Sequence, residues 1–352
     1  MPNLYWPRHR LFRSDERQQA RRQGRWQQAE ARAKQALLVS HAHCLDGVGA
    51  AVVTLRSLGA DQVGVAYVQP GDMAEVLQFF TAFPGRGRRF LVCDLSLQPE
   101  QYDTIVAACA KLRDAGWRLE WRDHHHKQWE GLDLSRLQRV VDVLEVNVDA
   151  TESGASLQQR ALAPNDAFLR RFAETVRDRD LWWNKTKDSE TLEFALEDLD
   201  THDFVTHFVY ADAAGPVVDA AIRDAAQRER DRQAAILRRL LGQARHWGDG
   251  HTRVAVVYGW LPKNTGLHEL LEEGAQIAIN VRPNGKLSLR SRKGADVCHL
   301  VARQFHGGGH PNASGADLGL KGIAFWWYVL RRGRVPAVGR LAETAVAELG
   351  TR

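Results

Sequence analysis

Cysteine is scarce in this sequence, which has only four in 352 residues: Cys44, Cys93, Cys109 and Cys298. They are far apart, and no two have the C-x-x-C spacing. The sequence therefore indicates neither a disulfide framework nor a structural zinc site. Cys93 and Cys109 lie in apolar runs and are predicted to be small core residues.

Long apolar runs are also missing. No run approaches the ~20 residues of a membrane span, and the first 26 residues have no apolar core of the signal-peptide kind. We therefore expect a cytoplasmic protein without a membrane partner. The composition, 44% hydrophobic and 26% charged, is typical of a soluble globular protein, and the length suits two domains.

The net charge of +5 is unevenly distributed, because residues 1–34 contain nine basic and only three acidic side chains. This basic, Gln-rich N-terminal arm, residues 1–36, could bind nucleic acid through counterion release. It could equally form a solvated helix packed loosely on the next domain.

Short β-rich runs alternate with helical stretches from residue 35 to about 150. The predicted strands are "ALLVS", "QVGVAYV", "RRFLVCDL", "WRLEWRD" and "RVVDVLEV", and the segments between them have apolar residues at helical spacing. This alternation predicts an α/β fold with a parallel sheet covered on both faces.

The remaining chain changes character twice. Residues 151–211 are predicted to be almost entirely helical and to complete a first domain, 37–211. A charged helix within 212–249 is predicted to be a linker. The β pattern then returns with "RVAVVYGW", "AQIAINVRP" and "KLSLRSR", which predicts a smaller α/β domain over 250–352.

Three predicted strands end in residues that bind metals. The first ends in "HAHCLDG", the third in "LVCD" and the fourth in "RDHHH". Ligands of a parallel sheet bind beyond the carboxyl ends of its strands, so these groups are expected to converge. Carboxylates and imidazoles together suit divalent ions such as Mn²⁺.

At these residues the chain resembles the DHH phosphoesterase superfamily, named for an Asp-His-His string. The resemblance covers residues 37 to about 318 and rests on "HAHCLDGVGAA", "LVCDLSL", "RDHHH" and "VRDRDLW" in order, followed by "LSLRSRKGADVCHLVARQFHGGGHPNASG". The last stretch is similar to the superfamily's C-terminal DHH-associated domain. The resemblance implies a parallel-sheet DHH domain joined by a helical linker to that smaller α/β domain.

The resemblance also implies roles for individual residues. It makes His41, Asp46, Asp94, His124 and Asp178 the ligands of two divalent ions, with Asp94 bridging them, and Mn²⁺ is the expected ion. Asp180 competes with Asp178, which is preferred. His125 would face the scissile phosphate, and Asp123 would orient an imidazole as carboxylates do around metal-bound histidines.

The first motif departs from the usual superfamily string H-x-x-x-D-x-D, because one residue is missing and Cys44 stands where an aspartate is usual. Some members share this H-x-x-C-x-D-G variant. Cys44 is either a thiolate ligand, which would favour Zn²⁺ or Fe²⁺ at that site, or a packed thiol beside a weaker site.

The second domain is predicted to bind substrate. By resemblance, Arg290 and Ser291 hold a phosphate or terminal nucleotide. Gly308 and Gly309 let backbone N–H groups approach a phosphate closely, and His310 offers another donor. Trp182 and Trp183 follow the "DRD" string after one leucine, Leu181; they either stack on a base or anchor helices in the core.

The sequence thus predicts a nano-RNase or oligoribonuclease-like phosphodiesterase that cleaves short single-stranded oligonucleotides or dinucleotides with two metal ions. Hydrolysis of a signalling dinucleotide or a small phosphate compound is the alternative among enzymes. A nucleotide or nucleic-acid binder that has lost one metal through Cys44 is the non-catalytic alternative. The sequence does not give the oligomeric state.

Overall fold

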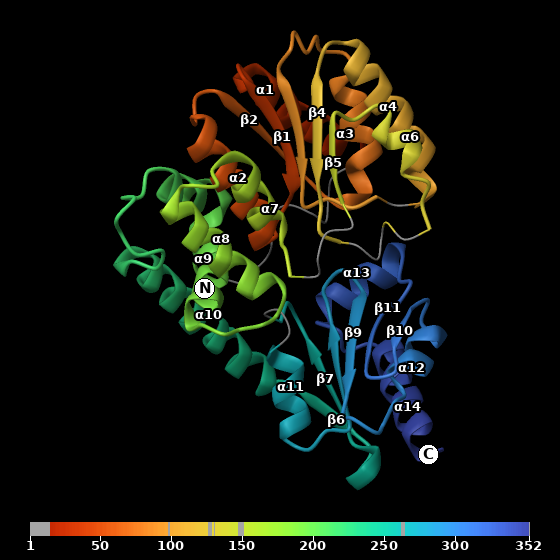
Figure 1. Ribbon diagram of the computed structural model, residues 1–352. Helices are drawn as coiled ribbons and strands as arrows, with labels where there is room; N and C mark the ends of the chain where they lie inside the picture. Colours follow the sequence, from red (N-terminus) through yellow and green to blue (C-terminus); the bar gives the residue numbers. More distant parts are fainter. Residues whose placement is uncertain are drawn as a thin grey trace. The chain divides into compact units, whose positions relative to one another are not determined.

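The computed structural model describes residues 15–97, 99–125, 129, 131–146, 151–261 and 265–351 (Figure 1). The chain forms two compact units, one made by Arg13–Arg230 and the other containing Asp231–Arg352. In the described residues, no helix combines the length and the apolarity that crossing a bilayer requires.

The first unit contains a five-stranded sheet in the order β2-β1-β3-β4-β5, and every neighbouring pair is parallel. The predicted parallel sheet is therefore confirmed. Its strands are β1 (Ala36–His41), β2 (Val63–Val68), β3 (Arg89–Cys93), β4 (Arg118–Arg122) and β5 (Val143–Glu145).

Alternating side chains on these strands build a core on each face of the sheet. Leu37 and Val39 of β1 belong to one cluster of buried residues, whereas Ala36 and Leu38 belong to another. Because β1 is apolar on both faces, it is the kind of strand that parallel sheets bury between two layers of helices.

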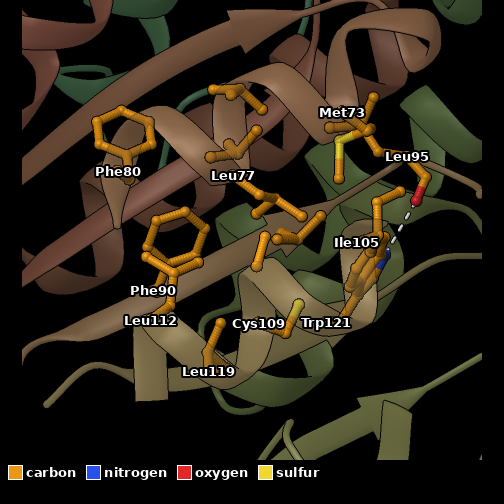
Figure 2. Close-up of a cluster of buried hydrophobic side chains, with 14 of the residues drawn as sticks. Met73, Leu77, Phe80, Phe90, Leu95, Ile105, Cys109, Leu112, Leu119 and Trp121 are labelled. Carbon is orange, nitrogen blue, oxygen red and sulfur yellow. Dashed lines mark hydrogen bonds between the residues drawn. The ribbon is translucent and has the colours of Figure 1, made fainter. Parts of the chain in front are cut away.

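Figure 2 shows part of the larger cluster, in which the ring of Phe80 meets that of Phe90 on β3 edge-on, with Leu77 among the other members. The indole N–H of Trp121 donates to the carbonyl oxygen of Leu95 at 2.9 Å, so the polar atom of this buried ring is satisfied.

Helices of the first unit cover both faces of the sheet, and several more follow its last strand in the chain. They are α1 (Asp15–Arg32), α2 (Leu45–Leu58), α3 (Met73–Phe80), α4 (Tyr102–Asp114), α6 (Ser135–Gln138), α7 (Gly154–Leu162), α8 (Ala167–Asp180), α9 (Lys187–Val209) and α10 (Ala220–Leu241), with short 3-10 turns η1 (Pro70–Asp72) and η2 (Pro99–Gln101). The predicted helical stretch after residue 150 corresponds to α7, α8 and α9, and α9 is kinked at Asp200.

The basic arm is helical from Asp15 to Arg32 and is part of the fold. Trp26 on α1 is buried and meets the ring of Phe79 edge-on at 5.5 Å. Arg22 pairs with Glu75 at 3.2 Å. The first fourteen residues of the arm lie outside the described residues, and its binding to nucleic acid stays a prediction.

The second unit contains a six-stranded sheet in the order β10-β11-β9-β8-β7-β6, parallel between β7 and β8 and antiparallel elsewhere. Its elements are β6 (Arg245–Trp247), η3 (Gly250–Thr252), β7 (Val254–Tyr258), α11 (Thr265–Glu272), β8 (Ile277–Val281), β9 (Lys286–Ser291), α12 (Cys298–Gln304), β10 (Gly308–His310), β11 (Ala313–Asp317), α13 (Gly322–Leu330) and α14 (Pro336–Gly350). This unit is the second α/β domain that the sequence predicts. The helix predicted as a linker is α10, and the boundary between the two units falls within it, at Asp231.

Candidate metal centre

Polar side chains follow three adjacent strands at the carboxyl edge of the first sheet. β1 ends at His41, Asp94 follows β3, and Asp123 begins the segment after β4. Strand β3 lies between β1 and β4, which places Asp94 in the middle of the group. The chain order reverses between β1 and β3, so this edge is a topological switch point, where open α/β sheets bind ligands.

Asp94 has no ordinary structural role. It is 1% exposed, and neither carboxylate oxygen accepts a hydrogen bond from the described residues. The nearest charged partners are imidazole nitrogens of His124 at 3.3 Å and His41 at 3.5 Å. Its φ of 56° is also rare for a residue other than glycine. A buried carboxylate without hydrogen bonds is costly, and a bound cation would remove that cost.

Three sets of ligand atoms in this region lie close enough to hold a metal, each within 4.8 Å of one another. The first is His41, Cys44 and Asp94; the second is Asp94, His124 and His125; the third is Asp46, His124 and Asp180. Asp94 and His124 each belong to two sets. The shared position of Asp94 is what a carboxylate between two ions requires.

Asp46 is held in place by the start of α7. The backbone N–H groups of Gly154 and Ala155 both donate to its carboxylate, the second at 2.9 Å. A Cβ at position 154 would lie 2.7 Å from Cβ of Asp94 and 2.8 Å from an oxygen of Asp46, so only glycine fits there. The close approach of Gly154 therefore fixes the positions of both Asp46 and Asp94.

The structure corrects one predicted ligand: Asp180, not Asp178, reaches the cluster. A carboxylate oxygen of Asp180 lies 3.5 Å from Nε2 of His124. The Asp178 carboxylate instead accepts hydrogen bonds from the backbone N–H groups of Lys185 at 2.9 Å and Thr186 at 3.2 Å. Residues two apart on a helix do not face the same way, so only one of the two aspartates can point to the site.

Asp123 lies behind the cluster and orients an imidazole. One of its oxygens is 2.8 Å from Nδ1 of His125, and the other accepts the indole N–H of Trp129 at 2.7 Å. The imidazole that it holds belongs to His125, and no described residue forms a hydrogen bond with the other nitrogen of this ring. Trp129 could not be assigned this role from its sequence position.

The carboxylates and imidazoles of the cluster shift one another's pKa values. Burial, Asp94 and Asp180 raise the pKa of Asp46 well above its usual range. Burial would raise the pKa of Asp94 as well, but the imidazoles of His124 and His41 hold it below its usual range. Although burial lowers the pKa of His124, the three carboxylates raise it to about 10. In the absence of metal the cluster therefore retains protons, which a divalent ion would have to displace.

Cys44 belongs to the cluster by position. It is the N-cap residue of α2 and shares a set with His41 and Asp94. Burial and the charges of Asp94 and Asp46 raise the pKa of its thiol well above the usual value. Without a cation, then, Cys44 is a thiol, and its service as a thiolate ligand stays a prediction.

The residues predicted to bind substrate lie in the second unit. Arg290 and Ser291 end strand β9, and the Ser291 hydroxyl donates to the side-chain oxygen of Asn312 at 2.7 Å. Gly308, Gly309 and His310 form strand β10 rather than a loop, and all three are exposed. Their roles in binding phosphate stay predictions.

No family model and no curated protein matches the sequence. Several solved structures resemble the chain at low identity. RecJ from Thermus thermophilus, solved with Mn²⁺, is 16% identical, with 93% of this chain and 54% of that chain covered and a TM-score of 0.49. The DHH domain of a member of a family of ribosomal proteins is 13% identical over 95% of this chain and 92% of that chain, with a TM-score of 0.49. An exopolyphosphatase-related protein from Bacteroides fragilis is 14% identical over 94% and 98% of the two chains, with a TM-score of 0.44. Likenesses of this size carry neither fold nor activity over to this chain.

Proposed function

We propose that this chain is a metal-dependent phosphoesterase of the DHH type, which hydrolyses phosphodiester bonds in short oligonucleotides. The observation that carries the proposal is Asp94, a buried carboxylate that accepts no hydrogen bond from the described residues although the imidazoles of His124 and His41 lie beside it. The ordered motifs that resemble the DHH superfamily support the same reading.

The donor set fits two divalent ions. His41, Cys44 and Asp94 would hold one, and His124 with Asp46 and Asp180 the other. Because Asp94 also forms a set with His124 and His125, its carboxylate would serve both ions. Mn²⁺ is the ion that we propose, because oxygen and imidazole donors predominate. When bound, two such ions would lower the pKa of a water molecule and offset charge on the phosphate oxygens.

The chain's own groups would orient the substrate. Asp123 fixes the ring of His125 through Nδ1, so Nε2 of His125 is the atom proposed to donate to a phosphate oxygen. Burial lowers the pKa of His125, but the hydrogen bond and charge of Asp123 raise it above its ordinary value overall.

Metal content and turnover test the proposal together. Purified protein loaded with Mn²⁺ would be assayed against di- to pentanucleotides, linear and cyclic dinucleotides, pyrophosphate and long single strands. We expect two ions per chain and cleavage of short linear oligonucleotides. If the protein instead prefers pyrophosphate or a cyclic dinucleotide, the proposed substrate is wrong but the proposed two-metal hydrolysis still holds.

Asp94→Ala is the decisive variant. It should lose both ions and several orders of magnitude in rate, because one carboxylate serves both positions. Asp61→Ala, an exposed aspartate paired with Lys34, is the matched control and should keep both properties. Turnover close to wild type in Asp94→Ala at saturating Mn²⁺ would reject the two-metal proposal.

A further inference from the structure

The turn that follows α8 exposes two indole rings. Trp182 is 64% exposed and Trp183 is 36% exposed, although large aromatic side chains are usually well buried. The alternative in which both rings anchor helices in the core is therefore wrong for Trp182. An exposed tryptophan needs another explanation.

Trp182 is braced on one face by a fixed cation. The guanidinium carbon of Arg179 lies 4.6 Å from the centre of the Trp182 ring. Arg179 is itself immobilised, since its Nε donates to Glu193 at 2.6 Å and its Nη1 to the side-chain oxygen of Asn184 at 2.8 Å. Among the described residues, no second cation and no aromatic ring stacks on Trp182. The opposite face of the ring, which is 64% exposed, is thus available to a ligand.

The backbone of this turn is strained and firmly held. Trp182 and Asn184 have φ values of 55° and 48°, in a region that residues other than glycine seldom occupy. The carbonyl oxygen of Asp178 accepts the N–H groups of Trp183 at 3.0 Å and Asn184 at 3.2 Å, while its carboxylate binds the next two N–H groups. Asp178 therefore builds the turn that presents the rings. Strain that the surroundings hold in place is typical of ligand-binding positions.

The turn lies beside the candidate metal centre. Trp182 is two residues from Asp180, so their Cα atoms are at most about 7 Å apart. Cations surround the rings: Arg177 lies 5.5 Å and Lys185 3.9 Å from the centre of Trp183. An aromatic face with neighbouring cations, next to a phosphate-hydrolysing centre, has the components of a single-strand nucleic-acid site.

We propose that Trp182 is a stacking platform for an unpaired nucleobase of the nucleotide adjoining the scissile phosphate. This inference rests on the proposed function, and it narrows the substrate class to nucleotides with an accessible base. A polyphosphate has no aromatic group that could stack on the indole, and the faces of a base within a duplex are already covered by neighbouring bases. Arg179 and Asp178 act as positioning residues for the platform.

The test compares an oligonucleotide with an abasic strand of the same length and charge. Trp182→Ala should weaken binding of the oligonucleotide by about tenfold to a hundredfold, and should leave binding of the abasic strand unchanged. Trp182→Phe, which keeps a smaller ring, should bind the oligonucleotide with an affinity between those of the wild type and Trp182→Ala. Binding is measured by fluorescence anisotropy with Ca²⁺ in place of Mn²⁺, and metal content is measured separately.

Tyr210→Ala provides the matched control, because Tyr210 is an exposed aromatic residue of the same unit. It lines a pocket along β2, and none of the residues that line this pocket belongs to the candidate metal centre. It should bind both strands as the wild type does. Equal losses for the two strands in Trp182→Ala, or no loss for either, would overturn the platform. Failure of the proposed function would look different, since the wild type would then hold no ions and cleave nothing.

Discussion

Asp178 and Asp180 are identical side chains with different structural roles, because they lie at different positions around one helix. Asp180 points to His124, and Asp178 caps the following turn. The "DRD" string contains both aspartates but does not indicate which one faces the strand ends, because that depends on the rotation of α8 about its axis. The sequence pattern prefers Asp178, whereas the structure places Asp180 beside His124.

Exchanging each aspartate for asparagine separates these roles. Asp180→Asn should lower Mn²⁺ occupancy and leave the metal-free stability unchanged or higher, because burial and Asp94 already raise the pKa of Asp180 and disfavour its charge. Asp178→Asn should keep the ions but lower the free energy of unfolding by about 1–3 kcal/mol, since the N–H groups of the turn lose a charged acceptor. Metal analysis and urea unfolding in EDTA check both. The reverse pattern would restore Asp178 as the ligand.

At the scale of single elements, the start of α7 is the contact on which the centre depends. Gly154→Ala would push a methyl group into Asp94 and Asp46, so we expect reduced metal occupancy together with a lower melting temperature. Gly24→Ala on α1 is the control, because nothing lies within 4 Å of its added Cβ and alanine favours helix there. Full metal occupancy in Gly154→Ala would show that the approach of α7 is unimportant.

Strands β3 and β4 are joined by a buried charge network. Glu120 accepts two hydrogen bonds of 2.7 Å from Arg89 and one of 3.1 Å from Arg122. Burial alone would raise the pKa of Glu120, but Arg89 and Arg122 hold it below its ordinary value. A depressed carboxylate pKa stabilises the fold above the unfolded value of about 4.3. That stability is lost as the pH falls through the lower folded value.

Glu120→Gln should therefore be less stable by about 2–3 kcal/mol at neutral pH, because the partly buried Arg89 loses its carboxylate partner and the buried Arg122 keeps only Glu145. Its stability should also fall less steeply between about pH 5 and pH 3 than that of the wild type. Urea unfolding across this range measures both effects, with Asp61→Asn at an exposed pair as the control. Parallel pH profiles of wild type and Glu120→Gln would contradict the role of the network.

The whole molecule divides into two units, and the sequence predicts that the first binds the metal ions and the second binds the substrate. Arg290→Ala and His310→Ala should raise KM by about tenfold or more while metal content and kcat change little, because these residues are predicted to capture phosphate. Lys286→Ala, another basic residue of β9, is the control. Loss of ions in either variant would show that the duties are not separate.

Much of this architecture is predictable because its signals are local. The alternation of short β-rich runs with segments of helical spacing predicts the parallel sheet, and the polar residues at the strand ends predict where the centre lies. Contacts between distant segments are not predictable in this way. The N–H groups that hold Asp46 come from Gly154 and Ala155, more than a hundred residues later, and nothing near Asp46 in the sequence points to them.

Cys44 gives the molecule a built-in chemical reporter. The other three cysteines are buried, so a thiol reagent added to the folded protein should modify Cys44 first, at an alkaline pH that offsets the raised pKa of its thiol. That position adjoins His41 and Asp94, where the first ion is proposed to bind. Alkylation followed by intact-mass analysis would then read the filling of the centre directly, one adduct when it is vacant and none when a metal covers the sulfur, with no substrate required.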